Sequence, residues 1–224
     1  MIRAIYVVVE GPTEEEFVRS LIQPYFASMH SFYDVRAIKL NTSPGHKGGD
    51  MSFARYQRNV LLLLKQEIEI VVTSLIDFYK LRTDFPEYES AKKQNQKEQS
   101  VEFLERACAK VINDERFVPY IQLHEFEALL FSSRRGFDAY FSDLTKNGTD
   151  ELTKIFSQYS NPEEINDGDT TAPSKRLEQL IPRYQKVLYG NVIALENGFQ
   201  VILNQCPRFR AWIELLESKI QNDG

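Results

Sequence analysis

Acidic side chains follow three separate apolar runs of the sequence. They are Glu10, Asp77 and the pair Glu125 and Glu127. In an open sheet of parallel strands the turns beyond the carboxyl ends meet at one crevice, so these carboxylates are expected to converge. Carboxylates brought together repel one another unless a cation lies between them, and oxygen ligands of this kind select Mg²⁺ or Mn²⁺. The pattern therefore predicts a divalent-metal site at the end of a sheet.

The same acids also have a simpler interpretation. A carboxylate is favoured in a solvent-facing loop and near the positive N-terminus of a helix. This explanation suffices for the run Glu14 to Glu16 taken alone. It is weaker for Glu10 and Asp77, because each of these ends a very apolar run and the helix dipole alone is a weak reason to place an acid there.

The first apolar run is expected to be a buried strand. Residues 2–9 are rich in β-branched and aromatic types and have almost no polar face, which is typical of a strand covered by helices on both sides. Gly11 and Pro12 indicate a tight turn. Thr13 is expected to cap the helix that follows, with Glu16 three residues later completing a capping box.

The rest of the first half alternates between the two kinds of element. We expect strands at 33–40, 68–76 and 118–123 and helices at about 52–66 and 101–112. The glycine-rich segment 41–50 is expected to be a loop, in which His46 and Lys47 could approach a phosphate. The polar run 90–100 is expected to be exposed. This alternation favours an α/β fold with a mostly parallel central sheet flanked by helices.

The second half is expected to be mainly helical. Helical spacing of apolar residues occurs at 137–156, 175–184 and 209–218. Two apolar stripes are expected to pack in the core, one formed by Leu177, Leu180 and Ile181 and the other by Phe209, Trp212, Ile213 and Leu216. The sequence thus predicts an α/β core at 1–131 and a helical C-terminal extension at 132–224 that packs on it as one compact unit.

Composition limits the class of protein. The chain has 224 residues, a formal net charge of −5 and a pI near 5.4, which argues against nucleic-acid binding by a general basic field but leaves a local basic strip open. No apolar run approaches the roughly 20 residues needed to cross a bilayer. Cys108 and Cys206, without a signal-like segment, indicate a reducing compartment. We expect a cytoplasmic protein with free thiols and no membrane insertion.

One short motif carries a resemblance to a known domain. The segment 8–14, Val-Val-Glu-Gly-Pro-Thr-Glu, resembles the first motif of Toprim domains, which occur in topoisomerases, primases and the overcoming-lysogenization-defect nucleases. Together with the segments 75–79, 84–86, 123–131, 173–176 and 206–212, it makes nearly the whole chain resemble a Toprim-like family of unknown function, DUF4276. The His-Glu-Phe-Glu-Ala and Cys-Pro-x-Phe-x-x-Trp stretches are its most distinctive segments.

The resemblance implies a two-metal, nuclease-like site. In the nuclease branch the first Glu of the motif and an acid four residues later bind metal, which gives that role to Glu10 and Glu14. In the topoisomerase branch the first Glu is a general acid or base, and this alternative stays open for Glu10. Asp77 corresponds to a further ligand, but Tyr79 stands where a second Asp is usual. One acid of the expected set is therefore missing.

The later acidic motif of such nucleases corresponds to Glu125 and Glu127. Asp84 or Glu127 could replace the missing acid, or the site could hold one metal tightly and a second only when substrate phosphate completes its shell. His124, beside the pair, is either a hydrogen-bonding core residue or a further ligand.

Two basic residues follow in the second half. Lys175 resembles the downstream lysine of these nucleases, which stabilises charge on a transferring phosphoryl group, and Arg176 beside it would clamp a phosphate. The simpler interpretation is a helix-start pair capped by Ser174.

Several functions are compatible with these residues. The first is a Mg²⁺- or Mn²⁺-dependent phosphodiesterase acting on DNA or RNA. The resemblance implies that such an enzyme takes part in bacterial anti-phage defence and acts beside an ATPase of the structural-maintenance or ABC type. The sequence has no P-loop pattern, so ATP hydrolysis would belong to another chain. The second is a non-catalytic interaction subunit, favoured by the missing acid after Asp77 and by the acidic composition. A third is a small-molecule phosphotransferase or nucleotide-binding protein using the same crevice.

Overall fold

The apolar run at the start of the chain forms a central strand of a parallel sheet. In the computed structural model, which describes residues 2–29, 34–40, 51–79, 81–140, 144, 146–166, 168 and 170–221, β1 (Ala4–Val9) lies between β2 (Asp34–Lys39) and β3 (Ile70–Asp77). Both pairings are parallel. All six residues of β1 are buried, which requires cover on both faces of the sheet.

The predicted strand at 118–123 is divided into two short strands. β4 (Phe117–Val118) and β5 (Ile121–Gln122) each pair in parallel with β3. Pro119 lies between them and has no backbone N–H for the ladder. At this break the side chain of Ser74 replaces strand pairing, because its Oγ accepts from the backbone N–H of Tyr120 at 3.1 Å and donates to the Tyr120 carbonyl at 3.0 Å.

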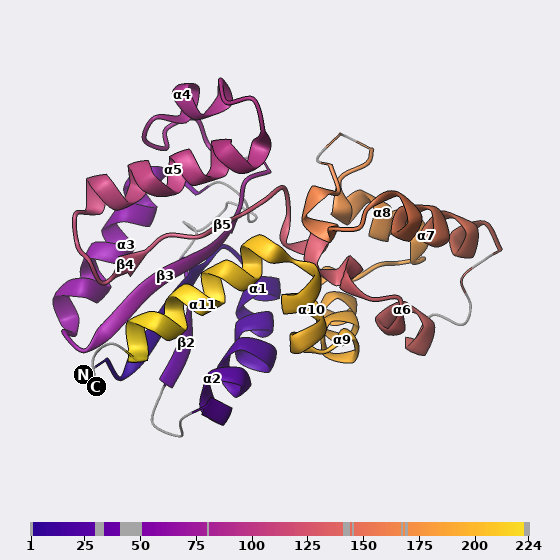
Figure 1. Cartoon of the computed structure of the whole chain (residues 1–224), viewed down its shortest axis with the longest axis horizontal. Helices are drawn as coiled ribbons and strands as arrows, with labels where there is room; N and C mark the ends of the chain where they lie inside the picture. Colours follow the sequence, from indigo (N-terminus) through magenta and orange to yellow (C-terminus); the bar gives the residue numbers. More distant parts are fainter. Residues whose placement is uncertain are drawn as a thin grey trace. The chain divides into compact units, whose positions relative to one another are not determined.

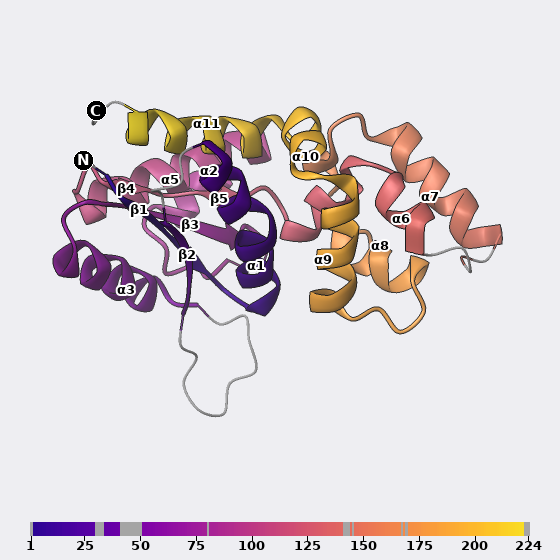
Figure 2. The same ribbon diagram turned by 90° about the horizontal axis from the view of Figure 1, so that it is seen from below.

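Helices cover both faces of this sheet. They are α1 (Pro12–Phe17), the π-helical turn η1 (Val18–Ile22), α2 (Gln23–Met29), α3 (Phe53–Gln66), α4 (Tyr88–Lys92), α5 (Lys97–Ile112) and the C-terminal α11 (Pro207–Gln221). Figure 2 shows α11 and α3 on opposite sides of the strands. The predicted α/β fold with a mostly parallel sheet flanked by helices and a mainly helical C-terminal part is confirmed (Figure 1).

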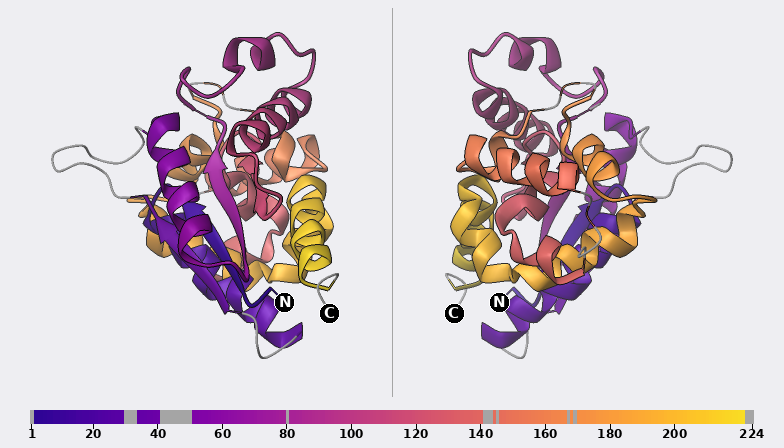
Figure 3. Two further views of the ribbon diagram at one scale, coloured as in Figure 1. Left: turned by 90° about the vertical axis from the view of Figure 1, so that its left-hand side faces the viewer. Right: turned by 90° about the vertical axis from the view of Figure 1, so that its right-hand side faces the viewer.

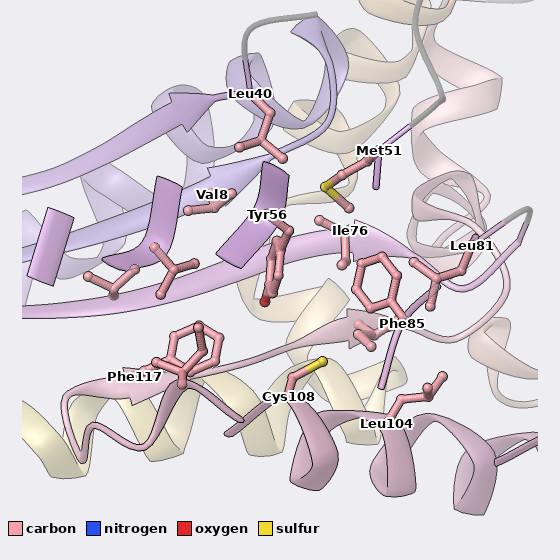
Figure 4. Packing of buried hydrophobic residues seen from close by; sticks show 14 of the residues in the cluster. Val8, Leu40, Met51, Tyr56, Ile76, Leu81, Phe85, Leu104, Cys108 and Phe117 are labelled. Carbon is pink, nitrogen blue, oxygen red and sulfur yellow. The ribbon is translucent and has the colours of Figure 1, made fainter. Parts of the chain in front are cut away.

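One face of the sheet packs against α3 and α5. Successive strand residues point to opposite faces, so alternate residues of β1 and β3 enter this layer. Its members include Tyr6, Val8, Tyr56, Val60, Val72, Ile76, Leu104 and Cys108 (Figure 4). Burial in this layer raises the pKa of the Cys108 thiol to about 12, so the thiol is protonated and inert.

The two helix starts that the sequence predicted behave differently. α3 begins close to the predicted position, and Ser52 caps it, because the Ser52 side chain accepts from the backbone N–H of Arg55. The predicted cap by Thr13 is wrong. α1 begins two residues earlier, with Gly11 at the N-cap and no side-chain cap, because Pro12 has a φ suited to the first helical position and no N–H to leave unsatisfied there.

The chain divides into two units. The first is Met1–Leu123 together with Trp212–Gly224, and the second is His124–Ala211. The sequence placed the boundary after residue 131 and assigned the last helix to the C-terminal part, whereas long-range contacts join residues 212–224 to the first unit. The Trp212 ring stacks on Tyr120 at 4.4 Å between centroids, and its Nε1–H donates to Thr73 Oγ1 at 2.8 Å. Figure 3 shows β3 between α3 and α11.

The second unit is helical. Its elements are the 3₁₀ segment η2 (Phe126–Ser132), α6 (Arg135–Tyr140), α7 (Lys146–Gln158), the 3₁₀ turn η3 (Pro162–Glu164), α8 (Pro173–Leu180), α9 (Lys186–Asn197) and α10 (Phe199–Gln205). The predicted helix at 137–156 is therefore two helices, and the one at 175–184 ends at Leu180. Both predicted apolar stripes are buried.

Buried polar side chains hold the helices of the second unit together. Asn197 accepts from the backbone N–H of Gly136 at 3.0 Å and donates to the Leu130 carbonyl at 2.8 Å. Glu163, which is fully buried, accepts from the backbone N–H groups of Arg208 and Phe209 at the start of α11. Each contact satisfies backbone groups that a helix end would otherwise leave unpaired.

Two further expectations can be placed. The glycine-rich segment 41–50, with His46 and Lys47, lies outside the described residues. Among the residues that are described, none belongs to a helix long and apolar enough to span a bilayer.

Candidate metal centre

Glu10 and Asp77 lie side by side at the carboxyl edge of the sheet. Glu10 directly follows β1, and Asp77 is the last residue of β3. The two strands are parallel neighbours with Val9 opposite Leu75, so topology alone brings the two acids to one edge. The backbone N–H of Asp77 donates to Glu10 Oε1 at 3.1 Å. Both side chains are partly exposed, so the edge is accessible to a ligand.

Glu14 is folded back against the turn that follows Glu10. The residue is 4% exposed although it lies in the first turn of α1. A Cβ atom built on Gly11 would lie 3.1 Å from Glu14 Oε2, so the missing side chain of Gly11 makes room for this carboxylate. The positive N-terminus of a helix also favours an acid at this position.

The two acids after Glu14 have other partners. Glu15 Oε2 accepts from Lys39 Nζ at 3.0 Å. Glu16 is hydrogen-bonded by Arg19, which lowers the pKa of the Glu16 carboxyl, and it also accepts from Ser20. These are surface ion pairs, so the simpler interpretation of the acidic run holds for Glu15 and Glu16.

The donor chemistry of the first unit fits a hard divalent cation. Glu10, Glu14 and Asp77 offer carboxylate oxygens from one turn and the adjacent strand end. Over the described part of the chain, no group of three or more acidic, His or Cys side chains is already gathered around one point. Mg²⁺ does not require such a cage, because it keeps several waters and is usually bound by one or two carboxylates plus substrate phosphate.

Asp84, a candidate for the missing acid, is engaged at the start of α3. Its Oδ1 accepts from the backbone N–H of Phe53 at 3.3 Å, and its carboxylate pairs with Arg82 at 3.5 Å. An acid at a helix N-terminus is stabilised by the unsatisfied N–H groups there.

The predicted pair Glu125 and Glu127 belongs to the second unit. Glu125 is 6% exposed and accepts two hydrogen bonds from Ser174, one from its backbone N–H and one from its hydroxyl, both at 2.9 Å. Glu127 is fully buried and pairs with Lys186 at 3.0 Å between Oε1 and Nζ. Burial and then the negative charge of Glu127 raise the pKa of Tyr184, so this phenol is neutral.

The two predicted basic residues differ in their freedom. Lys175 is partly exposed and pairs with Glu178 at 2.8 Å on the same helix. Arg176 donates from Nε to the Thr171 carbonyl at 2.8 Å and lies over the Tyr159 ring at 5.6 Å. Arg176 is thus held in place by residues of the second unit. The surface ion pair between Lys175 and Glu178 is weak, so Lys175 can readily take another anionic partner.

The predicted helix cap by Ser174 is wrong, because α8 has Ala172 at its N-cap and Pro173 at its first position. The hydroxyl of Ser174 goes to Glu125 instead. His124 is 5% exposed and has a φ of 63°, a left-handed conformation that is uncommon for residues other than glycine. The chain turns there from β5 towards the acidic pair.

Sequence reasoning missed Ser174 and Lys186 as partners of these acids. Both are distant in sequence from the residues that they contact, and neither has a local pattern that marks it. The only available signal was the position of Glu127 within an apolar run, since a buried carboxylate requires a compensating partner.

Proteins of known structure share similarity with nearly the whole chain. The chain is similar to the C-terminal region of the Xanthomonas campestris pv. campestris OLD protein, at 13% identity over 97% of each chain with a TM-score of 0.45. It is also similar to the C-terminal region of the Burkholderia pseudomallei OLD protein, at 16% identity over 95% of this chain and 99% of that one, with a TM-score of 0.41. No curated protein matches. The family model described as Domain of unknown function (DUF4276) matches residues 9–217, and the chain belongs to this family.

Proposed function

We propose that the protein is a Mg²⁺- or Mn²⁺-dependent phosphodiesterase that cleaves DNA or RNA at the edge formed by Glu10 and Asp77. The observation that carries this proposal is the hydrogen bond between Asp77 N–H and Glu10 Oε1, which holds the ends of two parallel strands within reach of one ligand. The resemblance of residues 8–14 to the first Toprim motif supports the same chemistry.

The residues of the first unit would hold the cation. Glu10 and Asp77 lie at the edge, and Glu14 lies against the turn that follows Glu10. When bound, a divalent cation supplies a Lewis acid for the phosphoryl oxygens and a more acidic water. Glu10 carries the alternative role of a general acid or base, which the topoisomerase branch gives to the first Glu of the motif.

Lys175 would neutralise charge on the phosphoryl group. Its ammonium group is partly exposed, and its present partner Glu178 is a surface acid on the same helix. Exposed pairs of this kind contribute about 0–1 kcal/mol, so an anionic phosphoryl group of the substrate can replace Glu178. Arg176 would act by positioning, because its guanidinium is already bound to Thr171 and Tyr159.

The proposed setting is a bacterial defence system in the cytoplasm, in which an ATPase of the structural-maintenance or ABC type acts with this chain. Two buried free cysteines, Cys108 and Cys206, support a reducing compartment. The lack of a P-loop pattern in the sequence supports a separate source of ATP hydrolysis.

A non-catalytic interaction subunit is the second candidate. Tyr79 replaces the expected second acid, and Asp84 is engaged at the start of α3. A site that binds metal too weakly would leave only the fold and its surface for binding a partner.

Nuclease assays separate the two candidates. Purified protein is incubated with supercoiled plasmid and with RNA in Mg²⁺ and in Mn²⁺, beside Glu10→Gln and Asp77→Asn. We expect the wild type to cleave and each variant to be about 100-fold slower or worse, because each removes a carboxylate that would hold the cation. Glu15→Gln is the matched control, since Glu15 pairs with Lys39 on the surface, and it should retain activity. A wild type that cleaves neither substrate supports the non-catalytic subunit.

A further inference from the structure

The second unit contains a buried carboxylate whose charge is already balanced. Glu127 has no exposed surface, and Lys186 Nζ lies 3.0 Å from its Oε1. The side chain of Lys186 is 44% exposed, so the ammonium group keeps part of its hydration while it compensates the acid. A buried carboxylate without such a partner would bear the full cost of desolvation.

Glu125 is committed in a similar way. Its two oxygens accept separate hydrogen bonds from the backbone N–H and from the hydroxyl of Ser174. Bidentate contacts of a carboxylate with a helix start are charge-assisted and therefore strong. Ser174 lies in the first turn of α8, and Lys186 is the first residue of α9, so the two acids contact the beginnings of two different helices.

We infer that Glu125 and Glu127 organise the second unit and are not metal ligands. Glu125 fixes the first turn of α8, which also carries Lys175, and Glu127 fixes the start of α9 through Lys186. Lys186 supplies the positive charge that a cation would otherwise supply to Glu127. The cation of the proposed function is then held by Glu10, Glu14 and Asp77 without help from this pair, and only this last statement rests on the proposed function.

A double-mutant cycle combined with metal titration tests the inference. Glu127→Gln, Lys186→Met and the double variant are compared with the wild type by urea unfolding and by calorimetric titration with Mn²⁺. We expect both single variants to be less stable and the double variant to lose less stability than the sum of the two, because it removes the buried charge together with its partner. Mn²⁺ affinity should be unchanged in every folded variant, whereas Glu10→Gln should weaken it by more than about tenfold.

A surface ion pair serves as the control for the buried pair Glu127 and Lys186. The surface pair Lys175 and Glu178 is mutated in the same way, and its cycle should show little coupling. If Lys186→Met does not fold, the Mn²⁺ affinity of Glu127→Gln and of the double variant still decides the case, because both variants remove the buried charge. A folded Glu127→Gln protein with Mn²⁺ affinity lowered by more than about tenfold, or additive losses of stability, would overturn the inference. A wild type that binds no Mn²⁺ would contradict the proposed function, and the stability cycle would then decide the inference alone.

Discussion

At the scale of single residues, the partner of each acid determines what the acid can do. Glu15 and Glu16 pair with the surface side chains of Lys39 and Arg19, and Glu163 accepts hydrogen bonds from backbone N–H groups. Glu10 and Asp77 instead lie at the edge of the sheet, where the backbone N–H of Asp77 donates to Glu10 Oε1. Position in the sequence separates Glu10 and Asp77, which end apolar runs, from Glu15 and Glu16, but it does not show the partner of each acid.

The contact between Thr73 and Trp212 gives a prediction at the same scale. Thr73 Oγ1 accepts from Trp212 Nε1–H at 2.8 Å, and both residues are buried. Thr73→Val keeps the shape of the side chain but removes the oxygen that accepts from the indole N–H and the hydroxyl that donates to the Val118 carbonyl. We expect the free energy of unfolding to fall by about 1–3 kcal/mol, measured by urea unfolding followed through the fluorescence of Trp212, the chain's single tryptophan.

Thr73→Ser is the control for this substitution, because it keeps the hydroxyl oxygen. It should lose less stability than Thr73→Val despite the smaller side chain. If Thr73→Val were as stable as the wild type, the hydrogen bond would not contribute to holding α11 on the first unit.

At the scale of elements, Arg116 joins the end of α3 to the strand β4. Its Nη2 donates to the Leu64 carbonyl at 3.1 Å, and its Nη1 donates to the Glu67 carbonyl at 3.0 Å. These carbonyls belong to the last turn of α3 and its C-cap, which lack partners within the helix. The Asp114 carboxylate holds the guanidinium in place, with its Oδ2 at 2.6 Å from Arg116 Nη2.

Arg116→Met should therefore weaken the first unit. We expect a loss of about 2 kcal/mol in the free energy of unfolding, against a negligible change for Arg106→Met, whose exposed side chain pairs with the surface acid Glu102 at 3.8 Å and lies over the Phe103 ring at 6.0 Å. Unfolding in urea with Trp212 fluorescence measures both. Equal losses in the two variants would contradict this role for Arg116.

The pH dependence of the same variant follows from Asp114. The hydrogen bond from Arg116 lowers the pKa of Asp114 below its ordinary value of 3.8. A lowered pKa contributes stability that is fully present above the unfolded value and is lost as the pH falls through the folded value. The difference between wild type and Arg116→Met should therefore be constant at neutral pH and shrink below about pH 4.

At the scale of the whole molecule, local pattern predicted the elements but not their distant partners. β1 and β3 were predictable because their burial on both faces leaves continuous apolar runs, and the meeting of Glu10 and Asp77 follows from parallel topology. Pro119 indicated a break between β4 and β5, but the surrounding apolar residues made the segment look like one continuous strand. The pairing of Glu127 with Lys186 and the return of Trp212 to the first unit join segments far apart in the chain, for which a single sequence carries no local mark.

The central claim is that Glu10 and Asp77 share one divalent cation. The most direct test is a crystal structure of the protein with Mn²⁺, with anomalous scattering measured at the manganese edge. The account predicts an anomalous peak bonded to carboxylate oxygens of both Glu10 and Asp77, and no peak at Glu125 or Glu127. A protein crystallised in saturating Mn²⁺ with no peak at the end of β1 and β3, or with the ion held by Glu125 and Glu127, would contradict it.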